Sequence, residues 1–213
     1  MTSRAERQEQ RRTERKEALV LRLLEPVESL LREGRRWADL TVDEIIERAD
    51  VPRSTFYYNF RVKDELLIAI TKPAMQEIID SAAGLYKLGP TASRAEFDEQ
   101  VRRTVDVWTP HVSLIDALYE AGAVNPRARE QFKTGWSGAY QDAIDYIRAG
   151  QADGTIRPEI DPVNHAAWLT WMAERGISQL VEPAEPEQRD AVCAALADII
   201  WSVLYGTSIN SAN

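Results

Sequence analysis

Apolar residues recur at spacings of three and four along most of this chain, the pattern of helices that bury one face. The first stripe precedes Gly34 and consists of Leu19, Leu23, Val27, Leu30 and Leu31. A later one, in a long helix expected over about 126–150, consists of Phe132, Trp136, Tyr140, Ile144 and Ile147. The sequence contains no run of alternating β-branched residues bounded by turns. We therefore predict an all-α protein of about nine helices.

The stretch 40–67 predicts two short helices joined by a tight turn. Thr41 followed three residues later by Glu44 has the spacing of a capping box, so a helix is expected to begin there. Pro52 disfavours helical backbone in the residue before it and suits the first position of a new helix. The first helix should therefore end just before Pro52, and a second should cover about 53–60.

The second of these helices has an outer face that suits DNA. Val51, Phe56 and Phe60 are expected to pack inward, which leaves mainly polar side chains outside. Arginine and asparagine pair with base edges, whereas threonine, tyrosine and lysine reach phosphates. We predict a helix-turn-helix whose DNA contacts come from Thr41, Arg53, Ser54, Thr55, Tyr57, Tyr58, Asn59 and Lys63. The alternative is a hairpin whose aromatic residues only pack, and it would need partners for several buried polar groups.

The charges are divided unevenly along the chain. The first 72 residues carry 15 basic and 14 acidic side chains, and the remaining residues carry 11 and 20. An overall net charge of −8 therefore does not exclude DNA as a partner of the amino-terminal part. Residues 1–16 are basic and almost free of apolar side chains, so we expect a flexible arm. It is either a solvated tail or an arm that reaches DNA; its cations are Arg4, Arg7, Arg11, Arg12, Arg15 and Lys16.

The stretch 40–67, with the LLREG that ends the preceding helix, resembles the DNA-binding segment of the TetR family of transcriptional regulators. The shared pattern includes Thr-hydrophobic-Tyr-x-x-Phe at 55–60 and a lysine at the start of the next helix. Arg61 and Val62 stand where the family usually has Pro-Ser, so an N-cap hydroxyl is lost. The run Trp171 to Arg175 and the closing Leu204 to Gly206 are similar to the ethionamide-type regulators within the family.

This resemblance implies a TetR-like fold with three parts. They are the arm at 1–16, a helix-turn-helix domain at 17–72, and a larger helical ligand-binding and dimerisation domain at 73–213. Aromatic stripes at helical spacing are ordinarily core, but the resemblance implies a cavity for a small, mostly hydrophobic effector. Its expected walls are Trp108, Tyr119, Phe132, Trp136, Tyr140, Trp168, Thr170 and Trp171. Thr170 and Ala173 stand where the ethionamide-type regulators present asparagines.

The last two predicted helices carry more apolar surface than packing within one chain seems to need. Intramolecular burial is one explanation. The resemblance implies another, a four-helix bundle with a second copy of the chain, through Ile177, Leu180, Val192, Leu196, Ile199, Ile200 and Val203. A two-fold dimer would place two recognition helices about one DNA turn, ~34 Å, or somewhat more apart, and would fit a palindromic operator.

The sequence has no pattern typical of catalysis or of metal and cofactor binding. His111 and His165 are the only histidines, and neither lies in an HExxH motif. Cys193 lies among alanines, as an inert buried thiol would, and a single cysteine fits a reducing cytoplasm. No apolar run approaches the ~18–20 residues of a membrane span. We expect a cytoplasmic protein that is not an enzyme, has no metal or cofactor, and has no membrane partner.

Together these features predict a ligand-responsive transcriptional regulator. We expect a repressor that binds a palindromic double-stranded DNA operator as a homodimer and is released by a small hydrophobic effector. Two alternatives stay open. One is a DNA-binding dimer without an effector, and the other is a helical small-molecule-binding protein whose basic arm is incidental.

Overall fold

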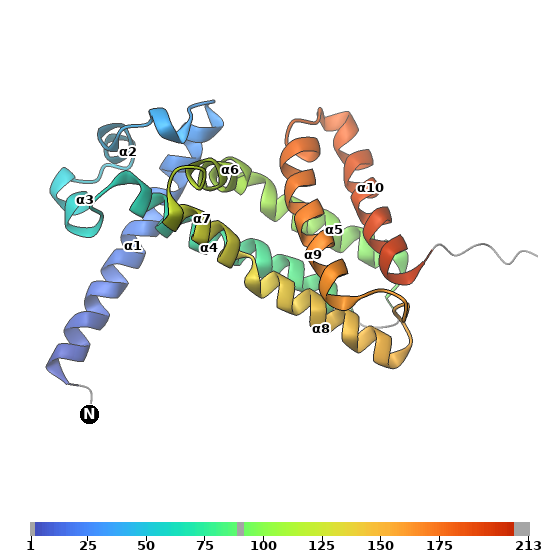
Figure 1. The fold of residues 1–213 in the computed structure, drawn as a ribbon. Helices are drawn as coiled ribbons and strands as arrows, with labels where there is room; N and C mark the ends of the chain where they lie inside the picture. The colour runs from blue at the N-terminus through green and yellow to red at the C-terminus, as the bar shows by residue number, and fades with distance from the viewer. Residues whose placement is uncertain (1–2, 89–91, 207–213) are drawn as a thin grey trace, which may run out of the picture. The chain divides into compact units, whose positions relative to one another are not determined.

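The computed structural model describes residues 3–88 and 92–206, and these residues form helices and turns without a strand (Figure 1). The all-α prediction is confirmed. The α-helices are α1 Arg4–Arg32, α2 Val42–Arg48, α3 Arg53–Asn59, α4 Lys63–Tyr86, α5 Arg94–Trp108, α6 Val112–Ala121, α7 Pro126–Gly135, α8 Ser137–Asp153, α9 Pro162–Gly176 and α10 Pro186–Tyr205. Two short 3-10 helices, η1 Trp37–Asp39 and η2 Thr109–His111, and a π-helical segment, η3 Ile177–Val181, complete the set.

The chain folds as two compact units. The first contains the described residues up to Ala74 together with 113–134, and the second contains 75–112 together with the described residues from 135 onward. Helix α4 therefore contributes its first half to one unit and its second half to the other. The expected domain at 73–213 differs from this division, because most of α6 and α7 belongs to the first unit.

In the first unit, α1 packs on α2 and α2 packs on α3. The apolar stripe predicted for α1 is buried along its whole length, with Leu23 and Val27 completely covered. Ile45 of α2 and Phe56 of α3 are also completely buried. Removing apolar side chains from water is the main stabilising contribution in such a small helical unit.

The expected flexible arm is instead the beginning of α1, which runs as one helix from Arg4 with Pro26 inside it. Ser3 and Glu6 form a capping box at its start, and the Gln10 side chain donates to Glu14 one turn later at 3.1 Å. Arginine, glutamate and glutamine are good helix formers, so a segment too polar to bury itself can still be helical. Figure 1 shows the first turns of α1 extending beyond α2 and α3.

In the second unit, α8 packs on α9, and α10 packs on α5 and lies beside α9 (Figure 1). The single long helix expected over 126–150 is wrong, because α7 ends at Gly135 and α8 begins at Ser137. Trp136 lies between them with φ −86° and ψ 0° and serves as the N-cap residue of α8. Glycine loses more backbone entropy in a helix than other residues, which favours an end at Gly135.

Candidate DNA interface and ligand cavity

Helix α3 presents the outer face expected of a recognition helix. Val51, Phe56 and Phe60 are buried, as predicted, and they hold α3 against the rest of the first unit. The exposed side chains are those of Arg53, Ser54, Thr55, Tyr57 and Tyr58, and Asn59 is half-buried with its amide donating to the Thr55 carbonyl. Tyr58 is 72% exposed, which contradicts the alternative of a hairpin whose aromatic residues only pack.

The turn between α2 and α3 is fixed by an arginine from α1. Asp50 has a φ of +50°, a left-handed backbone conformation that aspartate tolerates better than most residues. The Arg22 guanidinium donates to the carbonyl oxygens of Ala49 at 3.2 Å and Asp50 at 2.5 Å. These bonds satisfy carbonyl groups at the end of α2 and set the direction in which α3 leaves the turn.

Arg53 is held at the start of α3 by contacts that DNA can replace. Its Nη1 donates to both carboxylate oxygens of Asp43 at 2.7 Å, and its guanidinium lies 5.5 Å from the centre of the Tyr57 ring. The Arg53 side chain is still 63% exposed. An ion pair this exposed contributes little to stability, so a phosphate or a guanine edge can take the place of Asp43.

Thr41 and Glu44 form the predicted capping box of α2. The Thr41 hydroxyl accepts from the Glu44 backbone N–H at 3.2 Å, and the Glu44 carboxylate accepts from the Thr41 backbone N–H at 2.7 Å. Hydrogen bonds from the Thr41 side chain and backbone, with a further one from Arg35, lower the pKa of Glu44 to about 2. Thr41 therefore has a structural role in α2 whether or not it also contacts DNA.

Lys63 is used differently from the expected phosphate contact. Its ammonium donates to the carbonyl oxygens of Trp37 at 2.5 Å, Ala38 at 3.2 Å and Leu40 at 2.5 Å. An ammonium has three N–H donors, so these three acceptors use all of them. Partial burial lowers the pKa of Lys63. The lysine connects α4 to the segment before α2 and thereby positions the helix-turn-helix from inside.

Replacing Lys63 with methionine is expected to lower the free energy of unfolding by about 2 kcal/mol, because carbonyl groups lose a charged donor. The control is Lys72→Met, which removes the same charge from an exposed position of α4. Denaturant unfolding measures the stability of both variants, and DNA titrations at several salt concentrations measure the electrostatic contribution. If Lys63→Met leaves stability unchanged and reduces the salt dependence by about one phosphate contact, the lysine binds DNA instead.

The helical start of α1 adds cations beside α3. A groove in the first unit is lined on one side by Arg11, Arg12 and Arg15 and on the other by Ser54, Thr55, Tyr58 and Asn59. The Arg12 guanidinium lies 6.0 Å from the centre of the Tyr58 ring. These arginines were expected in a flexible arm, but they belong to a helix, and the sequence signal for that helix is the capping pair Ser3 and Glu6 at its start.

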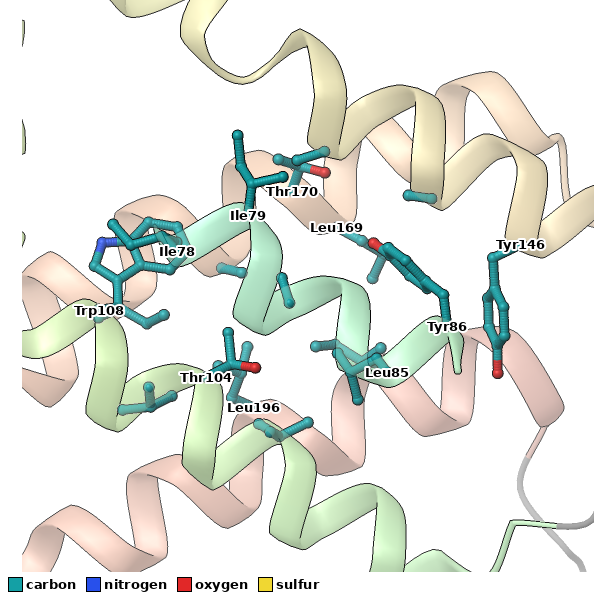
Figure 2. Close-up of a pocket in the computed structure, with 18 of the residues that line it drawn as sticks. Ile78, Ile79, Leu85, Tyr86, Thr104, Trp108, Tyr146, Leu169, Thr170 and Leu196 are labelled. Carbon is teal, nitrogen blue, oxygen red and sulfur yellow. The ribbon is translucent and has the colours of Figure 1, made fainter. Parts of the chain in front are cut away.

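The second unit contains an apolar cavity of about 110 Å³. Figure 2 shows Trp108 at one end of its lining and Tyr86 and Tyr146 at the other. The remaining lining comes mainly from α4, α5, α8, α9 and α10 and includes Ile78, Ile79, Phe97, Trp136, Thr170, Ala173, Ile177, Leu196 and Ile200. No charged side chain is among the lining residues, so the cavity suits a neutral ligand.

The structure brings only some of the expected ligand contacts to this cavity. Trp108, Trp136 and Thr170 line it. Tyr119 and Phe132 belong to the first unit, where their rings meet edge to face at 5.2 Å. The Tyr140 ring lies against Trp171 instead of lining the cavity, and Trp168 and Trp171 line a groove on the outside of α9 and α10. The cavity residues of α4, such as Ile78 and Tyr86, were missed because their sequence pattern is that of ordinary core.

The expected dimer-interface residues also divide into two groups. Ile177, Leu196 and Ile200 line the cavity and so face inward. Leu180 and Ile199 are exposed, whereas Val192 and Val203 are half-buried. Ile199 and Val203 share the outer groove with Trp168, which is 77% exposed. An outward apolar surface therefore remains on α9 and α10, but it is smaller than the sequence suggested and includes a tryptophan that was expected in the cavity.

The described part of the chain contains no cluster of three or more histidine, cysteine, aspartate or glutamate side chains arranged to bind a metal ion. None of its helices is long and apolar enough to cross a membrane. Cys193 is buried, and burial raises the pKa of its thiol, which suits the predicted inert cysteine.

Comparisons with known proteins agree with these features. Residues 37–70 match the family model of bacterial regulatory proteins of the tetR family. The chain is similar to the HTH-type transcriptional regulator EthR of Mycolicibacterium smegmatis, with 25% identity over 182 residues that cover 83% of this chain and 82% of EthR.

Two solved structures share the fold. One is FadR of Bacillus subtilis in complex with stearoyl-CoA, with a TM-score of 0.69, 15% identity and coverage of 86% of this chain and 98% of FadR. The other is a transcriptional regulator of Saccharomonospora viridis in complex with choline, with a TM-score of 0.67, 19% identity and coverage of 88% and 97%. Residues 37–70 therefore carry a DNA-binding domain of the tetR family, and the chain is similar to the transcriptional regulator EthR over most of its length.

Proposed function

We propose that the protein is a repressor that binds a palindromic operator as a homodimer and leaves it when a small, neutral, mostly apolar effector fills the cavity. The observation that carries this proposal is the outer face of α3, where six polar or aromatic side chains stand exposed or half-exposed beside the arginines of α1. Base contacts from α3 would supply specificity, and phosphate contacts from α1 would supply affinity and orientation.

The homodimer is proposed from the outward apolar surface of α9 and α10. Trp168 is 77% exposed, Leu180 is 61% exposed and Ile199 is 46% exposed. Trp168 and Ile199 line the same groove, and an exposed apolar groove is a feature of many protein interfaces. A two-fold pairing through this surface would double the recognition helices and so require an operator with two related half-sites.

The cavity supports an effector different from those bound by the structural neighbours. The S. viridis regulator holds choline, a cation, but no carboxylate lines the cavity here. FadR holds stearoyl-CoA, but a cavity of about 110 Å³ is too small for so long an acyl chain. We therefore propose a neutral and compact molecule.

Release requires the effector to bind more tightly to the conformation that does not bind DNA. A ligand with equal affinity for both conformations would leave the equilibrium between them unchanged. We propose α4 as the connection. Its first half carries Lys63, which positions the helix-turn-helix, and its second half carries the cavity residues Ile78 and Tyr86. A small movement of α4 would change the spacing of the two recognition helices and prevent them from binding successive major grooves together.

The test is fluorescence anisotropy with DNA from the promoter region beside the protein's own gene. Arg53→Ala or Tyr57→Phe is expected to weaken specific binding by about 1–3 kcal/mol for each lost base or phosphate contact, without lowering stability. Arg103→Ala, an exposed change on α5, is the control and should bind normally. If both α3 variants bind this DNA with wild-type affinity, the assignment of the recognition face is wrong. If no neutral apolar compound changes DNA binding, a DNA-binding dimer without an effector is favoured.

A further inference from the structure

The ion pair between Asp43 and Arg53 uses only one nitrogen of the arginine side chain. Nη1 of Arg53 donates to both carboxylate oxygens of Asp43 at 2.7 Å. An arginine has five N–H donors in a planar group, and those of Nε and Nη2 share one edge of it. Within residues 3–88 and 92–206, neither Nε nor Nη2 has a hydrogen-bond partner. The edge that can bind two acceptors at once is therefore free.

Two contacts orient the guanidinium group of Arg53 at the start of α3. Asp43 of α2 holds Nη1, and the guanidinium carbon lies 5.5 Å from the centre of the Tyr57 ring. The Arg53 side chain is nevertheless 63% exposed, so a partner from outside the chain can reach it. A side chain that is already oriented loses less entropy on binding than one that moves freely. The pair therefore presents a prepared site for a partner with two neighbouring acceptors.

The charge of the pair distinguishes between the two groups that arginine binds on DNA. A phosphate at the free edge of Arg53 would also lie close to the Asp43 carboxylate, which would repel it. Guanine presents O6 and N7 in the major groove, two uncharged acceptors that match the edge of a guanidinium group. A guanine can therefore bind beside Asp43, whereas a phosphate binds best once Asp43 has been displaced. The arrangement favours a base over the DNA backbone.

We propose that Arg53 binds a guanine in each half of the operator through Nε and Nη2, and that Asp43 is a positioning residue that keeps Arg53 from phosphates. This inference rests on the proposed DNA-binding function and deepens it by naming the base and the residue that orients the arginine. Asp43 should accordingly lower the affinity for DNA of any sequence and raise the preference for the operator.

The first experiment changes single atoms of the DNA and leaves the protein unaltered. Selection from a random DNA pool by the full wild-type chain should yield a palindrome with a conserved guanine in each half. Each conserved guanine of one half is then replaced by 7-deazaguanine, which lacks the N7 acceptor, or by inosine, which keeps O6 and N7. At one position, 7-deazaguanine should weaken binding about tenfold and inosine should leave it nearly unchanged. Arg53→Ala should lose this sensitivity at that position alone.

The second experiment tests Asp43. Asp43→Asn frees Arg53 for phosphates, so the slope of log affinity for scrambled DNA against log salt concentration should steepen by about 0.9 per chain. The ratio of operator affinity to scrambled-DNA affinity should fall about two- to fivefold, the range of an exposed ion pair. Glu47→Gln removes an exposed carboxylate one turn later on α2 and is the matched control. Adding Asp43→Asn to Arg53→Ala should leave this ratio as in Arg53→Ala.

Three results would overturn the inference and leave the proposed DNA-binding function standing. They are full affinity for every 7-deazaguanine operator, a sensitive guanine that stays equally sensitive in Arg53→Ala, and an Asp43→Asn ratio no lower than that of Glu47→Gln. All three concern DNA that the protein has selected. A pool from which no sequence is enriched would instead count against the proposed function and this inference together.

Discussion

Replacing Ile199 with glutamate is expected to give a monomer that binds the operator at least about 100-fold more weakly than the wild-type protein does. Ile199 is 46% exposed and lies in the outer groove of α9 and α10 with Trp168 and Val203. If this surface pairs with its copy, the new carboxylates would be buried without partners and would oppose association. A monomer retains one recognition helix and loses much of the difference between specific and non-specific binding, which is about 10³- to 10⁷-fold for typical regulators.

The choice of Ile199 follows from the structure. Ile200, the adjacent residue, lines the internal cavity, so Ile200→Glu would disturb folding and dimerisation together. Val124→Glu is the matched control, because Val124 is 86% exposed and belongs to the first unit. Sedimentation velocity reports the assembly state and fluorescence anisotropy reports the operator affinity. A dimeric Ile199→Glu protein with full affinity would show that the interface lies elsewhere.

The helix-turn-helix was the part best predicted from sequence, because its signals are local. The capping pair at Thr41 and Glu44 lies within one turn of helix, and Pro52 acts on its immediate neighbours. The buried positions of α3 follow directly from helical periodicity. Each of these features depends on residues a few positions apart, so neither the rest of the fold nor a partner was needed to predict them.

The role of Lys63 and the walls of the cavity depend on long-range packing. The carbonyl groups that bind Lys63 lie 23 to 26 residues before it, and nothing in their sequence marks them as acceptors. Trp136 and Trp168 both lie on apolar helical stripes, yet one is completely buried and the other is mostly exposed. Periodicity identifies an apolar face, but which element covers that face is decided by the packing of distant helices.

Replacing Arg11, Arg12 and Arg15 together with glutamine is the second change for which we expect a large effect on DNA binding. These three cations lie on the side of the groove opposite Ser54, Thr55 and Tyr58 of α3, and a dimer would carry two such sets. Each phosphate contact contributes about 0.9 to the slope of log affinity against log salt concentration. If all six arginines bind phosphates, the slope should fall by about 5, and affinity at moderate salt should fall by about 100-fold or more.

The loss should come from charge and not from unfolding of α1, because glutamine is nearly as good a helix former as arginine. Circular dichroism should therefore show unchanged helix content, and discrimination between the operator and a scrambled DNA should change much less than total affinity. Arg102→Gln with Arg103→Gln, on α5 of the second unit, controls for a general loss of positive charge. If the triple variant keeps the wild-type salt slope, the start of α1 is a solvated helix and α3 binds DNA without it.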